Sequence, residues 1–281
     1  EATSTTDGAL QTDGGLSVVK DAVFGDDVKL LSDSSVLSFG ADSDVTITHN
    51  ADTGVTLNSM DISGVSSINA GQIGGSRNYI YNGDTSLAQR ATSVSNVGDG
   101  NEGYHVQDRY SVEVSGSSPS GKLTMSRATE VPSGFQYSMK FDCTTAESSL
   151  AAAESFRFEQ RLEGQDLYAW KKGTADALPV TLSFWVNATK TGTNIVRLYD
   201  NDNTRHIAKS YTVNSSNTWE YKTITYAGDT TGAFDRDNGT SLQILFYLAA
   251  GSNYTSGTLA TSWAANDATN AAVGQVNNLD S

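Results

Sequence analysis

The first quarter of the chain consists of short apolar runs that are closed by turn residues. Between residues 14 and 73, runs such as "SVLSFG" and "VTITHN" are followed by Gly, Asp or Asn. This spacing predicts a meander or stacked coil of short strands. Phe24 and Phe39 are the only aromatic residues before Tyr79, so one chain buries too little apolar area to offset the entropy of ordering. We therefore predict that residues 1–76 form a β-rich stalk and attachment region in which three copies of the chain associate as a homotrimer.

A glycine-rich segment separates this stalk from a region with longer runs. Residues 59–78 end in paired glycines and a serine, which is typical of a hinge. Beyond the hinge, apolar and polar positions alternate in a way that predicts nine strands and an antiparallel β-sandwich over residues 77–281. The predicted strands are 104–114, 122–128, 135–144, 155–163, 179–189, 194–200, 206–213, 219–228 and 241–250. Only residues 145–156 favour a turn or two of helix.

Composition supports this all-β prediction and narrows the partners. The 281 residues are 37% hydrophobic and 18% charged, with 26 Gly, a mixture that favours strands and turns. The formal net charge of −14 disfavours nucleic acid or an anionic bilayer as partner. No apolar run reaches the roughly 18 residues of a membrane span, so we expect no membrane insertion. The N-terminus lacks signal-peptide features and begins with Glu, so we expect a processed chain or a fragment.

Few residues suggest catalysis. Cys143 is the only cysteine, and strand alternation places it on one face with Met139 and Phe141 as a buried, inert thiol. The three histidines have no metal-ligand spacing, and neither a nucleophile elbow nor a phosphate-binding loop occurs. The even spacing of Glu159 and Glu163 would suit a glycosidase pair, but alternation with arginines favours a solvated sheet face. We therefore predict that the chain is not an enzyme.

Two aspartate-rich stretches raise the question of calcium. Residues 200–206 ("DNDNTRH") and 235–239 ("DRDNG") place Asp and Asn at alternate positions, as oxygen-ligand loops do. Neither stretch has the closing glutamate, and Arg205 and Arg236 lie within them. Hairpin turns are therefore favoured, no cofactor is predicted, and Ca²⁺ is the alternative.

Aromatic residues are the candidates for ligand binding, because sugar rings stack on exposed aromatic faces. Trp170 and Trp263 lie in polar, turn-rich surroundings and are the predicted glycan platforms. Trp185 and Trp219 lie in predicted strands and are expected to face the core or pack at its rim. Three tyrosines complete the predicted glycan-binding set: Tyr104, Tyr168 and Tyr254.

Three segments carry a resemblance to known proteins. The motif "NYIYNGDTSLAQRATS" (78–93) resembles the opening of the receptor-facing domain of marine bacteriophage tail-fibre proteins, and residues 14–58 are similar to their shaft segments. Residues 179–228, with "SFWV" followed by a "TW" strand start, resemble jelly-roll carbohydrate-binding modules. Such modules usually close with a further strand, which residues 274–281 lack. Either the chain is cut or another protomer supplies that strand.

The resemblance implies a structural fibre protein on a virion surface, in an extracellular setting. Its jelly-roll sandwich would contact a host-surface glycan or receptor, and its N-terminal end would contact other virion structural proteins. The role is adhesion or particle decoration, and no catalytic residue is carried over. One alternative is a carbohydrate-binding module of a secreted bacterial polysaccharide-degrading protein. Another is a depolymerase spike acting between chains of a trimer, which lacks a nameable carboxylate pair.

Overall fold

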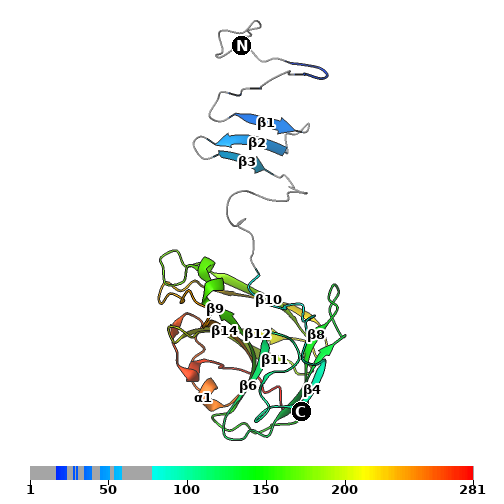
Figure 1. Ribbon diagram of the computed structural model, residues 1–281, viewed down its shortest axis with the longest axis vertical. Helices are drawn as coiled ribbons and strands as arrows, with labels where there is room; N and C mark the ends of the chain where they lie inside the picture. The colour runs from blue at the N-terminus through cyan, green and yellow to red at the C-terminus, as the bar shows by residue number, and fades with distance from the viewer. Residues whose placement is uncertain are drawn as a thin grey trace. The chain divides into compact units, whose positions relative to one another are not determined.

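The computed structural model describes residues 17–23, 28, 30, 35–39, 45–50, 54–58 and 78–280, and the chain divides into two compact units, residues 1–75 and 76–281 (Figure 1). In the first unit, strands β1 (Val36–Phe39), β2 (Val45–Asn50) and β3 (Gly54–Asn58) form an antiparallel sheet in sequence order. Apolar side chains of this unit lie in solvent: Val19 and Val23 are almost fully exposed, and Leu37 is about half exposed.

The second unit is built on a seven-stranded antiparallel sheet in the order β15-β12-β11-β14-β9-β6-β5. Its strands are β5 (Gly103–Tyr104), β6 (Tyr110–Ser115), β9 (Ser155–Glu163), β11 (Gly192–Asp200), β12 (Arg205–Val213), β14 (Thr240–Ala250) and β15 (Ala264–Ala265). Two smaller antiparallel sheets accompany it: β10 (Val180–Val186) with β13 (Glu220–Tyr226), and β4 (Ser93–Val97), β7 (Lys122–Ala128) and β8 (Ser138–Thr145). The short helical turns are η1 (Gly164–Asp166), η2 (Tyr168–Trp170), α1 (Ser252–Thr255) and η3 (Ala268–Asn270). The all-β prediction is confirmed.

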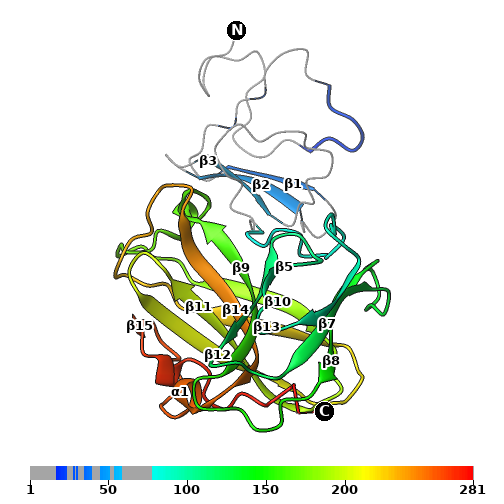
Figure 2. The ribbon, with the colours of Figure 1, turned by 60° about the horizontal axis from the view of Figure 1, so that its bottom comes forward.

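The two small sheets cover different halves of one face of the large sheet (Figure 2). Ile224 and Tyr226 of β13 pack with buried residues of β9, β11, β12 and β14 in a first core cluster. Leu123 and Met125 of β7 pack with Phe156 of β9 and buried residues of β6 and β14 in a second cluster. The second unit is therefore a sandwich whose second layer is divided in two.

The opposite face of the large sheet is covered only in part. Ile195, Ala208 and Tyr247 pack under Ala271 and Ala272 of the C-terminal segment. Residues 274–280 form no strand; the amides of residues 276 and 278 donate to carbonyls of β11 and β14, and residue 279 is buried in the second core cluster. These residues therefore pack on their own chain. The part of this face that β6 and β9 contribute carries charged side chains instead.

Three local predictions differ from the structure. The predicted strand 104–114 breaks into β5 and β6, because Arg109 adopts a φ of 76° and turns the chain. Strand β4 was not predicted. The predicted helical turn within 145–156 is wrong, because Glu147 accepts hydrogen bonds from the Ser120 and Gly121 amides and its own amide donates to a carbonyl near the C-terminus.

The remaining predictions for the second unit concern Cys143 and membrane spans. Cys143 lies with Met139 and Phe141 against the second core cluster, as predicted, but its thiol is only half buried. Burial, helped by the charge of Asp142, raises the pKa of this thiol. Within the described ranges, no helix has both the length and the apolar character needed to cross a bilayer.

Candidate functional site

A groove at the β5 edge of the large sheet is the candidate site. It has a volume of about 470 Å³, within the range of ligand pockets. The segment before β4, the turn between β5 and β6, the end of β9 and the start of β14 all contribute to it. The lining residues are Gln89, Arg90, Tyr104, Asp108, Arg109, Arg161, Glu163, Asn238 and Thr240.

A turn around Asn82 places Gln89 and Arg90 in the groove. Asn82 has a φ of 52°, its side-chain oxygen accepts from the Leu87 amide, and its Nδ2 donates to the Leu87 and Asp108 carbonyls. The Asp108 carboxylate accepts from the Gln89 amide at 3.1 Å and from Arg90 Nη1 at 2.7 Å. The asparagine and the Gln–Arg pair of the 78–93 motif therefore build one wall of the site.

The arginines of the groove keep hydrogen-bond donors available. Arg109 lies over the Tyr81 ring at 4.4 Å and 3.9 Å from Glu163, and among the described residues its guanidinium makes no hydrogen bond. Its positive φ is an uncommon conformation for a residue with a side chain, and such conformations cluster at functional sites. Within residues 78–280, Arg90 donates only from Nη1, to Asp108, and its guanidinium carbon lies 5.7 Å from the centroid of the Tyr104 ring.

Arg161 is held by a carboxylate network beneath the groove. Its Nε donates to Glu159 at 2.7 Å and its Nη2 to Glu113 at 3.2 Å. Burial lowers the pKa of Arg161, but the hydrogen bond and charge of Glu159 outweigh it and raise the pKa overall. Glu159 itself is buried between Arg157 and Arg161. The predicted solvated face is therefore wrong for Glu159, because both arginines of the same strand fold over its carboxylate.

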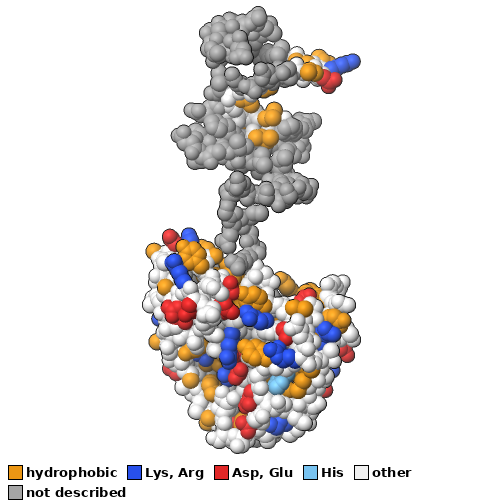
Figure 3. Space-filling view, viewed as in Figure 1, with side chains coloured by type: hydrophobic (Ala, Val, Ile, Leu, Met, Phe, Trp, Pro, Cys, Tyr) orange, Lys and Arg blue, Asp and Glu red, His pale blue; other side chains and the backbone are white. Residues whose placement is uncertain are grey.

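This arrangement suits a ligand with both a ring and a negative charge. Guanidinium groups recognise carboxylate, sulfate or phosphate through paired N–H donors, and Tyr104, with 41% of its surface exposed, offers a ring for stacking. Figure 3 shows one face of the second unit, on which basic, acidic and hydrophobic side chains lie close together. Of the predicted glycan-binding residues, the groove contains Tyr104.

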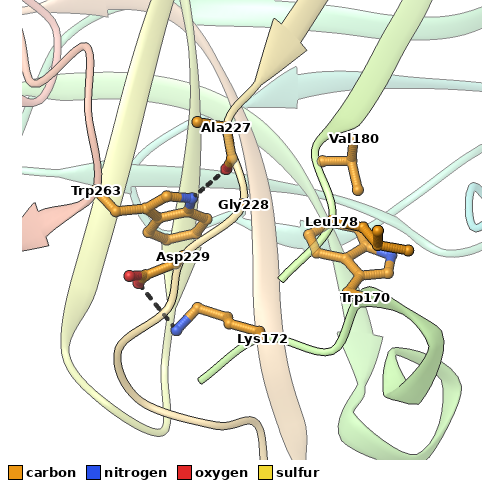
Figure 4. Close-up of a pocket in the computed structure, with 8 residues that line it drawn as sticks. All are labelled: Trp170, Lys172, Leu178, Val180, Ala227, Gly228, Asp229 and Trp263. Atoms are coloured by element: carbon orange, nitrogen blue, oxygen red, sulfur yellow. Dashed lines mark hydrogen bonds and ion pairs between the residues drawn. The ribbon is translucent and has the colours of Figure 1, made fainter. Parts of the chain in front are cut away.

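Trp170 and Trp263 line the same small cavity (Figure 4). The cavity between them holds about 10 Å³, room for one water molecule at most. Trp170 is only 7% exposed and packs edge-to-face on Tyr79, so its assignment as an exposed platform is wrong. The short turn η2 directs Tyr168 outward and Trp170 into the first core cluster. Trp263 is half buried and donates from Nε1 to the Ala227 carbonyl at 2.8 Å.

A buried lysine occupies the floor of that cavity. Lys172 Nζ lies 2.5 Å from Asp200 and 3.2 Å from Asp229, and it donates to the Thr231 and Gly232 carbonyls. Burial raises the pKa of Asp229, but hydrogen bonds from Arg205 and the Thr231 amide and the charge of Lys172 hold it below its ordinary value.

The aspartate-rich turn at 200–206 is therefore bound to side chains of the protein. Its first residue, Asp200, pairs with a lysine ammonium, and Asn203 donates to the same carboxylate. Within the part of the chain that the structure describes, no group of three or more His, Cys, Asp or Glu side chains could hold a metal ion.

The other aromatic predictions have mixed outcomes. Tyr168 is exposed with Arg236 stacked on it at 4.4 Å, and Tyr254 is half buried against the third cluster, formed by Ile195, Ala208, Tyr247, Ala271 and Ala272. Trp219 is half buried, as expected of a rim position. Trp185 was expected to face the core or pack at its rim, and it does not face the core: Phe184 takes the inward position of β10 and leaves Trp185 40% exposed.

Comparison with known proteins adds little to this geometry. No protein-family model matches the chain, and no curated protein matches it. A solved structure, the enzymatically active domain of tailspike protein 4 from bacteriophage CBA120, matches with a TM-score of 0.31 and 15% identity, over 50% of this chain and 17% of that one. At this TM-score we transfer neither fold nor residues. The matched domain is described as enzymatically active. The prediction that this chain is not an enzyme is therefore withdrawn, and catalysis is kept as a candidate function.

Proposed function

We propose that the chain is a structural fibre protein of a phage virion, and that its sandwich binds a host-surface glycan carrying acidic groups. The observation that carries this proposal is the groove itself, which is lined by three guanidinium groups and an exposed tyrosine ring. The resemblance of residues 78–93 to receptor-facing fibre domains supports the same reading, because Gln89 and Arg90 of that motif line the groove.

The net charge of the chain affects how an acidic ligand can bind. With a net charge of −14, the protein repels an acidic polymer at long range. Binding of such a polymer therefore depends on local guanidinium donors. Arg109 offers them, because its guanidinium makes no hydrogen bond among the described residues, although Asp108 and Glu163 also line the groove. Solvent-exposed guanidinium groups bind anions less strongly at high salt, so we expect the interaction to weaken as ionic strength rises.

Replacing Arg109 by Gln tests the groove. A charge-assisted hydrogen bond contributes roughly 1.5–3 kcal/mol, so affinity for an acidic glycan is expected to fall by about tenfold or more. Biolayer interferometry with immobilised polygalacturonate, alginate and heparin measures this loss. Lys140→Gln removes the same charge from an exposed position on β8 and is the matched control, which keeps native affinity. Equal losses in both variants, or no binding of the native chain to any acidic glycan, would refute the proposed groove.

A second candidate function is cleavage of the bound glycan. Asp108 and Glu163 both line the groove, and most glycoside hydrolysis uses two carboxyl groups that flank the scissile bond. The same polysaccharides, incubated with the native chain, are assayed for new reducing ends. Release that is abolished in Glu163→Gln supports catalysis, and intact polysaccharide after prolonged incubation contradicts it.

We propose in addition that the first unit associates as a homotrimeric stalk. Exposed Val19, Val23 and Leu37 support this, because water-exposed apolar side chains are covered when chains associate. Light scattering is expected to give three times the 29.7 kDa chain mass. Leu37→Glu should dissociate the trimer, whereas Ser38→Glu, at the neighbouring exposed position of β1, should not. A native mass of one chain would contradict the stalk.

The virion location has its own test. Antibodies against residues 78–281 should label the surface of phage particles in electron micrographs. The control is that the antibody recognises the isolated chain. Particles that then carry no label would contradict the fibre proposal, whereas binding at the groove is tested separately by the Arg109→Gln variant.

A further inference from the structure

The solvent face of β10 and β13 is a surface separate from the groove. The two strands pair in antiparallel register, with Thr181 opposite Thr225, Ser183 opposite Thr223 and Trp185 opposite Tyr221. All six of these side chains are exposed. The first core cluster receives the apolar side chains of most alternate positions: Val180, Leu182, Phe184, Ile224 and Tyr226. Strand alternation therefore gathers two aromatic rings and four hydroxyl groups on one face.

The aromatic pair lies at one end of this face. Trp185 is 40% exposed and Tyr221 56% exposed, and their ring centroids lie 5.3 Å apart with an angle of 51° between the planes. The cross-strand contact holds the rings in place, so little conformational entropy is lost when a ligand stacks on them. The pair therefore offers an ordered apolar platform on an otherwise polar strip.

The rest of the face supplies hydroxyl groups and no charge. Thr181 Oγ1 lies 2.9 Å from Thr225 Oγ1, and Ser183 and Thr223 fill the row between them and the rings. The charged residues of the two strands, Glu220 and Lys222, occupy the alternate positions and pair with each other at 2.6 Å. Hydroxyl groups both donate and accept hydrogen bonds, as the hydroxyls of a sugar do.

We infer that this face, formed by Thr181, Ser183, Trp185, Tyr221, Thr223 and Thr225, binds an uncharged polysaccharide chain. The rings stack against the apolar side of a sugar ring, and the hydroxyl row bonds to its neighbours along the chain. This face carries no charged side chain, so it disfavours the acidic glycan proposed for the groove. An acidic group bound here would lose hydration without gaining a cationic partner. The inference goes beyond the proposed function, since ligand class and surface both differ.

Affinity electrophoresis of the full chain tests this inference. Native gels contain laminarin, galactomannan or dextran as the uncharged probe. We expect at least one of these polysaccharides to retard the native chain. Trp185→Ala should raise the dissociation constant for that polysaccharide at least tenfold. Phe135→Ala removes a similarly exposed ring from the loop between β7 and β8 and should leave retardation unchanged.

A second variant guards against loss of folding. Thr223→Lys leaves both rings in place but adds a long charged side chain in the middle of the face, and it should abolish retardation while keeping the native melting temperature. Binding to acidic glycans should survive in both variants, so failure here is distinct from failure of the groove. The inference would be overturned if none of the three polysaccharides retarded the native chain. It would also be overturned if Trp185→Ala and Thr223→Lys were retarded as much as the native chain.

Discussion

Replacing Lys172 by Met is expected to lower the free energy of unfolding by about 3–5 kcal/mol, the usual cost of breaking a buried ion pair from one side. The ammonium is buried between Asp200, which has no exposed surface, and Asp229. Methionine keeps most of the volume of the side chain but leaves the Asp200 carboxylate facing an apolar group. The Thr231 and Gly232 carbonyls lose their donor as well.

Urea denaturation at pH 7 measures this loss. Lys171→Met is the matched control, because the Lys171 side chain is exposed. This substitution should change the free energy of unfolding by less than about 0.5 kcal/mol. The double variant Lys172→Met with Asp200→Asn should recover part of the loss, since it removes the uncompensated charge. A Lys172→Met protein as stable as the control would show that the cluster does not depend on the lysine.

Acidification from pH 6.5 to about 4 is expected to remove roughly 3 kcal/mol of stability through His206 alone, at about 1.4 kcal/mol per pKa unit. The imidazole is fully buried on β12, and within residues 78–280 neither ring nitrogen has a hydrogen-bond partner. Burial, and then the nearby charge of Arg197, lowers its pKa from 6.5 to about 4, although Asp267 acts in the opposite direction. His206 is therefore protonated near pH 6.5 in the unfolded chain, but only near pH 4 in the folded chain. This contribution to stability is complete above pH 6.5 and is lost as the pH falls.

His206→Gln removes the titrating group. Unfolding free energies at pH 7 and pH 5 are compared within each protein, so that any packing change caused by the substitution cancels. The native chain should lose more stability across this interval than the variant, by roughly 2 kcal/mol. Equal losses would show that the imidazole is not held in its neutral form by the fold.

Much of the sandwich could be predicted from alternation alone. Predicted and observed strands agree closely where apolar residues occupy every second position, as in β7 and β9, and also in β14, whose apolar residues form an almost continuous run. Strand β4 was missed because "SVSNV" offers only two apolar side chains, Val94 and Val97, too few to show a period. The break at Arg109 was missed because a positive φ at a residue other than glycine has no clear sequence signal.

The tryptophans show where local composition misleads. Polar neighbours suggested that Trp170 was exposed, yet one turn of 3₁₀ helix is enough to bury it. For Trp185 the signal was present in the sequence: Val180, Leu182 and Phe184 share one parity, which places the next residue on the opposite face. Parity within a strand was the better guide to exposure.

The groove lay beyond prediction for a different reason. Its residues come from four separate segments, and only tertiary packing brings Arg90, Arg109 and Arg161 together. The sequence showed the pairing of arginines with glutamates along β9, but not that Glu159 is buried. Two residues of the groove could be named in advance: Tyr104 as a glycan-binding residue, and Glu163 as a member of a possible carboxylate pair.

The divided second layer has a consequence for how this sequence can vary. Although the second layer is divided, stacked rings join the two core clusters. Phe184 of β10 contacts Phe246, which stacks on Phe158, and Phe158 stacks in turn on Phe141 of β8. A substitution of one of these inward rings therefore affects the packing under both small sheets. On β10 and β13 themselves, inward and outward positions alternate strictly, so the six outward residues can change while the buried ones stay fixed. The chemistry of this face can then change without a change in the stability of the sandwich. New side chains can therefore appear on this face without passing through unfolded intermediates.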